Sequence, residues 1–418
     1  MHRTWLPSLI VLIAVSACGY RPVRFADAPA ATRARDDLPV DMPAPIAIDP
    51  RMQLAEVYMR RPVLDALDAS EFPDAGDVNA LDEVVASSWF TPDSGRLRTL
   101  GGYARHEPEP PLSVVSTGAD GAPTEVRDAR GNLFVLRLDR PDRPEMTTAS
   151  EAIASRLLWS FGYSTPEAHV IELRRRDLQG TPRAVAWLGG KESVRACAIH
   201  RPDGVDLGPT PSAMTRSDDP NDRVPHRDRR TLRALAVMGA WLEMPQVGTR
   251  LTRDYYVGAQ GCGHVRHLLV GLDGALGASR VPAPRRSDEL RADAGPRPLA
   301  NFYTLGFAPD PPATHAQREH PGLGAIDGNV DPRRWRPSFP YEPVDRILPA
   351  DGYWAAVRLM GMGEAVLAEA VAGGELSDPR AARTLLSILK ERRERVARGW
   401  FGAVTPLRAT GTSAEGLE

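Results

Sequence analysis

The sequence is poor in several residue types, and each shortage narrows what the protein can do. Only three cysteines occur in 418 residues, Cys18, Cys197 and Cys262, so no framework of several disulfides holds the fold together. Lysine occurs only as Lys191 and Lys390, which leaves few amines for chemistry. The 52 basic and 54 acidic residues nearly balance, and a formal charge of −2 provides no global field that would attract nucleic acid or an anionic membrane.

Familiar enzyme motifs and long hydrophobic runs are missing as well. No G-x-S-x-G, H-E-x-x-H or Walker loop occurs in the sequence. The apolar run at the N-terminus, residues 6–15, is too short to span a bilayer. Hydrophobic residues nevertheless make up 42% of the chain, which is enough to build a large globular core.

The N-terminal run suits a secretory signal, because it follows a basic start and ends in small residues directly before Cys18. That ending resembles a bacterial lipobox, in which the thiol receives diacylglycerol and the preceding peptide is removed. We therefore predict a lipoprotein signal peptide over residues 1–17, lipidation of Cys18, and a cell-envelope protein anchored to a bacterial membrane and facing the periplasm or the exterior. The alternative is an ordinary secretory signal with a chance cysteine.

The two remaining cysteines leave a choice open. Outside the cytoplasm, Cys197 and Cys262 either form one disulfide or stay as two isolated thiols, since their distance does not follow from the sequence.

Composition divides the rest of the chain. Residues 18–50 are rich in Ala, Pro, Arg and Asp without apolar periodicity, which predicts a disordered tether. Residues 51–110 are interpreted as an N-terminal extension, and residues 408–418 as a flexible tail.

The body between these ends shows first strand patterns and then mainly helical patterns, which predicts an α+β fold. Strands are expected over residues 112–116, 124–127, 133–138, 168–173, 183–188 and 194–199, with one helix over 148–162. Further helices are expected over residues 232–242, 351–372 and from 379 onward, with a hairpin at 254–257 and 264–272.

Several blocks of this body resemble a family of uncharacterised bacterial secreted proteins and lipoproteins. The blocks are residues 77–90 (DVNALDEVVASSWF), 150–166, 217–226, 229–242, 267–277 and 353–407. More complete members of that family are similar to atypical kinases of the HipA-toxin and spore-coat type. The resemblance and the order of elements imply a two-lobed protein-kinase-like fold. A small antiparallel β-rich N-lobe with one helix would span residues 111–205, and a larger, mainly helical C-lobe would span 206–407.

The kinase resemblance implies three candidate site residues. Phosphoryl transfer needs a cation at the phosphates, an acid paired with it and carboxylates for Mg²⁺. Arg137 stands where the kinase pattern has lysine, and its planar fork is not equivalent to an ammonium. Glu151 stands at the paired acid, although Thr148 and Glu151 also match a T-x-x-E capping box. Asp273 is the nearest carboxylate to the metal-binding strand end.

Other positions of the pattern hold residues without the required chemistry. Gln246 follows the helix expected over 232–242, where the resemblance implies a catalytic Asp, and Leu251 replaces an Asn. Gly271 replaces the metal-binding Asp, and Asp273 lies two positions later, on the same face of an extended strand. One displaced carboxylate without its Asn partner does not predict a metal site.

Two further sequence patterns are interpreted as structural. Residues 226–228 spell HRD, but the position five residues after Asp228 is not Asn, so Asp228 is expected to favour the next helix N-terminus. Cys262, His264 and His267 suggest a metal, but strand alternation places His267 on the opposite face from the other two. No metal site is predicted there.

We therefore expect a membrane-anchored lipoprotein with a kinase-like fold that has lost phosphoryl transfer and acts as a binding or scaffold protein in the cell envelope. Its expected partners are the membrane, through Cys18, and an envelope protein, but no nucleic acid. The alternative is a divergent ATP-dependent kinase or another group-transfer enzyme that uses Arg137, Glu151 and Asp273. Only that alternative calls for ATP and Mg²⁺ as cofactors.

Overall fold

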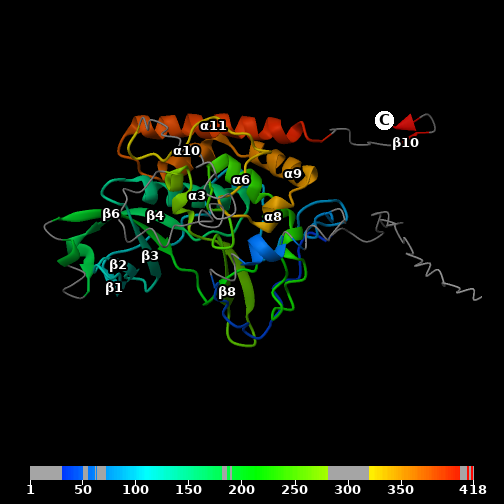
Figure 1. Cartoon of the computed structure of the whole chain (residues 1–418). Helices are drawn as coiled ribbons and strands as arrows, with labels where there is room; N and C mark the ends of the chain where they lie inside the picture. The colour runs from blue at the N-terminus through cyan, green and yellow to red at the C-terminus, as the bar shows by residue number, and fades with distance from the viewer. Residues whose placement is uncertain are drawn as a thin grey trace, which may run out of the picture.

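The computed structural model describes residues 31–49, 55–61, 63, 72–180, 186–188, 191–280, 320–404, 412–413 and 416–417. The chain forms an α+β fold, as expected. A curled six-stranded sheet lies at one end, and a helical C-terminal part extends beside it along α11 (Figure 1). The predicted signal peptide, residues 1–17, and Cys18 lie outside the described residues.

The six-stranded sheet has the order β4-β6-β3-β2-β1-β5. Its strands are β1 (Leu112–Thr117), β2 (Pro123–Arg127), β3 (Leu133–Leu138), β4 (Ala168–Arg174), β5 (Leu178–Gln179) and β6 (Ser193–His200). All neighbours are antiparallel except β1 and β5. On β3, Phe134 and Leu136 pack into one core, whereas Arg137 pairs with Cys197 of β6 on the opposite face. Because Cys197 packs against Ala152 of the following helix, this second face is the helix-facing one.

Most of the predicted strands are confirmed, and one is wrong. The strands expected over 112–116, 124–127, 133–138, 168–173 and 194–199 are present. Of the strand expected over 183–188, residues 183–185 lie outside the described part of the chain, and 186–187 are helical. The apolar residues Trp187 and Leu188 reach the sheet core from this helical turn, so burial there does not require a strand.

Helix α3 (Met146–Phe161) follows β3 and lies between the sheet and the helical part. The carboxylate of Asp139 accepts hydrogen bonds from two N–H groups of its first turn, each at 3.0 Å. The helix ends at Gly162, whose φ of 128° suits glycine. The capping box expected of Thr148 and Glu151 is wrong: the helix starts at Met146, and the Thr148 hydroxyl donates to Asp139 (2.6 Å).

A second sheet of three antiparallel strands lies away from the helices, where β8 is visible in Figure 1. It consists of β7 (Val205–Pro209), β8 (Thr252–Val257) and β9 (His264–Leu269). The hairpin predicted at 254–257 and 264–272 is confirmed, with β9 ending three residues early. The part assigned to a helical lobe, residues 206–407, therefore begins with strands, because β7 pairs with β8 across the residues 210–251.

Residues 31–49, here called the N-terminal strap, lie against this second sheet. The N–H of Val40 donates to a carbonyl of the β8–β9 turn (2.8 Å), and that of Ile46 donates to a carbonyl of β7 (2.7 Å). Asp36 is buried and accepts hydrogen bonds from the Ser88 N–H and hydroxyl, both at 2.7 Å. The prediction of a disordered tether over residues 18–50 is therefore wrong for the strap, since backbone pairing does not require apolar periodicity.

The structure describes parts of two other predicted segments. Residues 51–110 are more than an extension, because Trp89, Phe90 and Tyr103 belong to the main core. Of the predicted tail 408–418, the structure describes only β10 (Thr412–Ser413) and β11 (Gly416–Leu417), which pair as a small hairpin.

The helical part packs around one core that α3 shares. Its helices are α5 (Arg230–Arg233), α6 (Leu235–Leu242), α8 (Glu342–Asp345), α9 (Pro349–Met360), α10 (Glu364–Ala372) and α11 (Pro379–Phe401). The single helix expected over 351–372 is two helices, α9 and α10. They separate at Gly363, whose N–H donates to the carbonyl of Leu97 (2.8 Å). Helix α11 starts as expected, with Asp378 as its N-cap and proline at the next position.

One buried arginine, Arg392, joins α6 and α11 at the centre of this core. Arg392 of α11 donates to the Trp241 carbonyl at the end of α6 (2.9 Å) and to the carbonyl of Asp327 (2.8 Å). Its guanidinium also pairs with the Glu243 carboxylate (2.6 Å), and its side chain is only 1% exposed. Arg392 thereby satisfies carbonyls that a helix end leaves without intrahelical partners.

Candidate functional site

The three residues nominated by the kinase resemblance come together where the sheet, α3 and a turn after β9 meet. Arg137 lies on the helix-facing side of β3, and Glu151 lies in the second turn of α3. Asp273 belongs to the 3-10 turn η5 (Leu272–Gly274), which packs closely on α3. The charges of Asp273 and Arg137 both act on the Glu151 carboxyl. These residues are 136 positions apart at the extremes, so only the tertiary fold unites them.

Glu151 is the buried centre of this group. It is 2% exposed, and burial is the main cause that raises its pKa to about 8. The negative charge of Asp273 raises the pKa further, while Arg137 and the backbone N–H groups of Leu272 and Asp273 oppose the shift. Its Oε2 atom has no hydrogen-bond partner in the described part of the chain. At neutral pH the native Glu151 therefore keeps its proton and offers a hydrogen-bond donor.

Gln246 lies beside the same turn. A Cβ atom placed on Gly274 would be 3.0 Å from the amide carbon of Gln246, so the two residues are in close contact. Neither the amide nitrogen nor the amide oxygen of Gln246 has a hydrogen-bond partner among the described residues, although both atoms are buried. The residue at the position implied for a catalytic Asp thus joins the group, with an amide in place of a carboxylate. Arg137, Glu151, Gln246 and Asp273 are called the polar site below.

The other two substituted positions contribute no oxygen ligand to the polar site. Leu251 is buried in the main core. Gly271 has a φ of 68° at the start of the η5 turn, a conformation that favours glycine. The polar site therefore offers the carboxylate of Asp273, the amide oxygen of Gln246 and the protonated acid of Glu151.

Mg²⁺ is held by carboxylates together with phosphate and water oxygens, so this donor set does not suit a resident magnesium ion. Within the residues that the structure describes, no group of three or more His, Cys, Asp or Glu side chains is arranged to hold a metal ion. Cys262 and His264 lie in or beside the β8–β9 turn, whereas His267 points to a buried aspartate.

A second group of buried titratable residues was not expected from the sequence. His226 contacts the Asp222 carboxylate (2.7 Å), and His267 contacts that of Asp254 (2.8 Å). Trp89 stacks on His267 with ring centroids 4.0 Å apart. Burial opposes the lowered pKa of Asp222, and the hydrogen bond from His226 is the leading cause of that lowering. In the sequence, only the four-residue spacing between Asp222 and His226 could have indicated this group. The register of the β8–β9 hairpin brings the other pair, Asp254 and His267, together.

The HRD triplet has a structural role different from the expected one. The carboxylate of Asp228 pairs with Arg233 (2.9 Å). The N-terminus of α5 is capped instead by Asp77, which accepts from the N–H of Arg230 (2.6 Å) and from that of Thr231 (3.2 Å). The role expected of Asp228 is therefore performed by a residue about 150 positions earlier in the chain.

The cysteines are two separate thiols. Cys197 is buried in β6, and Cys262 is exposed in the β8–β9 turn. Of the two alternatives left open by the sequence, the structure has the one without a disulfide.

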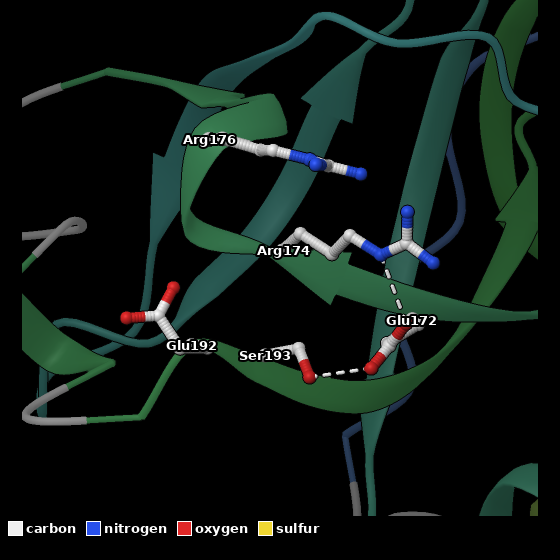
Figure 2. Close-up of a pocket in the computed structure, with 5 residues that line it drawn as sticks. All are labelled: Glu172, Arg174, Arg176, Glu192 and Ser193. Carbon is white, nitrogen blue, oxygen red and sulfur yellow. Dashed lines mark hydrogen bonds and ion pairs between the residues drawn. The ribbon is translucent and has the colours of Figure 1, made fainter.

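A shallow pocket of about 220 Å³ lies at the ends of β4 and β6 (Figure 2). Figure 2 shows Glu172 accepting hydrogen bonds from Arg174 (2.9 Å) and from the Ser193 hydroxyl (2.6 Å). Arg176 and Glu192 complete the lining. The charges of Glu172 and Arg174 are paired with each other and exposed. The lining of this pocket includes no member of the polar site.

Comparison with known proteins finds no match: no protein-family model, no curated protein and no solved structure is significantly similar to this chain. The family resemblance and the two-lobed kinase-like arrangement therefore stay predictions. In the described part of the chain, no helix has both the length and the apolar character needed to cross a bilayer.

Proposed function

We propose that this protein is a lipid-anchored protein of the bacterial cell envelope that uses a kinase-like fold to bind a polar partner, without transferring phosphoryl groups. The observation that carries the proposal is the state of Glu151. It is 2% exposed and is acted on by the charges of Asp273 and Arg137, and burial is the main cause that raises its pKa to about 8. A carboxyl that serves as the anionic partner of a phosphate-binding cation would need to be ionised at neutral pH.

The order of elements supports the kinase-like part of the proposal. Three antiparallel strands, β1 to β3, precede α3, three further strands extend the same sheet, and a helical part follows. The residues at the kinase-pattern positions Arg137, Glu151 and Gln246 then lie near one turn, η5.

The chemistry of the polar site favours hydrogen bonding over catalysis. It combines a cation at Arg137, a neutral acid at Glu151, an amide at Gln246 and one carboxylate at Asp273. These groups supply both donors and acceptors at a place where buried polar atoms lack partners. A loop or terminus of an envelope protein, with backbone amides and carbonyls, offers the complementary groups.

The experiment is a thermal-shift measurement of the chain with ATP and Mg²⁺. A ligand at 100 times its Kd stabilises a native protein by about 2.7 kcal/mol, which is readily measured. We expect no change in Tm with ATP, with Mg²⁺ or with both. Arg137→Ala serves as the matched control, because any binding at the polar site should depend on this cation.

A divergent kinase or other group-transfer enzyme is the second candidate, and the convergence of Arg137, Glu151 and Asp273 favours it. It predicts the opposite result in the same experiment: a rise in Tm with ATP and Mg²⁺ that Arg137→Ala and Asp273→Asn both abolish. That outcome would overturn the proposed loss of phosphoryl transfer.

The lipid anchor has its own test. We expect intact-mass analysis of the protein from a bacterial membrane fraction to show a chain that begins at Cys18 and carries diacylglycerol. Acyl chains contribute about 0.8 kcal/mol per buried CH₂, so Cys18→Ala should move the protein from the membrane fraction to the soluble fraction. Cys262→Ala, at an exposed thiol, should leave the distribution unchanged. An unmodified Cys18 in the membrane fraction would contradict the prediction.

A further inference from the structure

Four arginines lie near one another close to the end of α3, and one of them stacks on a tryptophan. The residues are Arg96, Arg105, Arg266 and Arg358, and the tryptophan is Trp159. They are called the arginine face below. Arg105 and Arg266 are exposed, whereas Arg96, Arg358 and Trp159 are half-buried.

Contacts place the aromatic ring against one of these cations and near a second. The guanidinium of Arg96 lies 4.4 Å from the Trp159 ring centroid. A Cβ atom on Gly102 would lie 3.3 Å from the Trp159 ring and 3.9 Å from Nη2 of Arg105. Arg358 is fixed nearby, because it donates to the carbonyls of Phe161 and Asp93.

The positive charge of the arginine face is poorly compensated. No carboxylate of the described residues lies within 4.0 Å of the Arg96, Arg105 or Arg266 guanidinium. Burial lowers the pKa of Arg96, and the like charges of Arg266 and Arg105 lower it further, against the opposing charge of Asp93. Repulsion of this kind is relieved when an anion binds between the cations.

The strap continues toward the expected lipid anchor at Cys18. The strap enters the described structure beside residue 86, through a bridge between Arg33 and Ala86, and the chain reaches Arg96 ten positions later. Cys18 and Arg33 are fifteen positions apart. Fully extended, this stretch reaches about 50 Å, and any less extended path brings the body nearer to the acyl chains. A membrane that holds Cys18 therefore lies within reach of this surface.

We propose that the arginine face rests on the anionic headgroups of the membrane that holds Cys18. Guanidinium groups bind lipid phosphates in pairs of hydrogen bonds, and Trp159 supplies an aromatic ring of the kind enriched at membrane interfaces. The interaction is local, since the whole chain carries a formal charge of only −2. This inference rests on the proposed lipid anchor at Cys18. It adds the orientation of the folded part of the chain on that membrane.

The test is vesicle co-sedimentation of the chain carrying Cys18→Ala, so that no acyl chain contributes. We expect binding to phosphatidylcholine vesicles that contain phosphatidylglycerol, and a loss of that binding as salt is raised. Each arginine near an anionic surface strengthens binding by about fivefold, so Arg96→Gln with Arg105→Gln should weaken it by about 25-fold.

The matched control is Arg334→Gln with Arg383→Gln, two exposed arginines that give the same change in net charge. It should bind like the parent chain. Arg266→Gln, at an exposed side chain, adds a single variant that is not expected to disturb folding. Equal binding by both double variants, or equal binding to vesicles of phosphatidylcholine alone, would overturn the proposal. Because the acyl chain is absent throughout, these outcomes are independent of whether Cys18 is lipidated in the cell.

Discussion

Arg392→Met is expected to lower the free energy of unfolding by about 3–5 kcal/mol, since it breaks a buried ion pair by removing one partner. The Glu243 carboxylate would remain buried without the cation that now lies 2.6 Å away. The carbonyls of Trp241 and Asp327 would also lose their donors. Methionine preserves much of the hydrophobic stem, so the loss reports on the polar contacts. Urea unfolding followed by circular dichroism measures it.

Arg395→Met is the matched control, three positions further along α11. Its side chain is 40% exposed and pairs with Glu391 (2.9 Å) on the same helix. Exposed pairs of this kind contribute less than about 1 kcal/mol. If the two variants lost similar stability, the assignment of Arg392 as the link between α6 and α11 would be wrong.

Glu151→Gln is expected to stabilise the protein by an amount that grows with pH. In the native state the pKa of Glu151 is raised from 4.5 to about 8, chiefly by burial. Between these values the unfolded chain gives up the proton and the native protein keeps it, so this group costs the native protein stability as pH rises through that window. At 1.36 kcal/mol for each pH unit, the cost reaches about 3 kcal/mol at pH 7. Glutamine does not titrate, so the variant does not carry this loss of stability.

The measurement is the free energy of unfolding of both proteins from about pH 5 to about pH 8. The difference between variant and parent should be small at the acid end and should grow steadily toward the native pKa. Glu364→Gln is the control, because the pKa of the exposed Glu364 is lowered by its pair with Lys390. A difference for Glu151→Gln that stayed flat, or that fell with rising pH, would show that the carboxyl is ionised in the native protein.

Local patterns were sufficient to predict most regular elements. Strand β3 alternates in the way a half-buried sheet requires, and α11 begins with the Asp-Pro sequence that starts helices. Local patterns failed where a distant residue determines the outcome. Asp139 sets the start of α3, in place of the expected capping box, and Asp77 caps α5 in place of Asp228.

In the candidate site, too, local sequence predicted some features and distant contacts determined the others. The identities of Arg137, Glu151 and Asp273, and the substitution of Gln246 for an acid, could be named from sequence. The protonation state of Glu151 could not, because it depends on burial against η5 and on a charge 122 positions away. The arginine face was likewise invisible in a chain whose overall charge nearly cancels.

The sequence by itself determined the α+β class, the alternation of the strands and the residue types available for chemistry. These properties follow from neighbours a few positions apart, whose spacing sets which side chains share a face. Only the tertiary structure decided that the strap pairs with the second sheet, that Asp and His side chains are buried together, and that four residues meet as the polar site. Those features depend on contacts between distant segments, and on the loss of water around them, which raises or lowers a pKa only after the chain has folded.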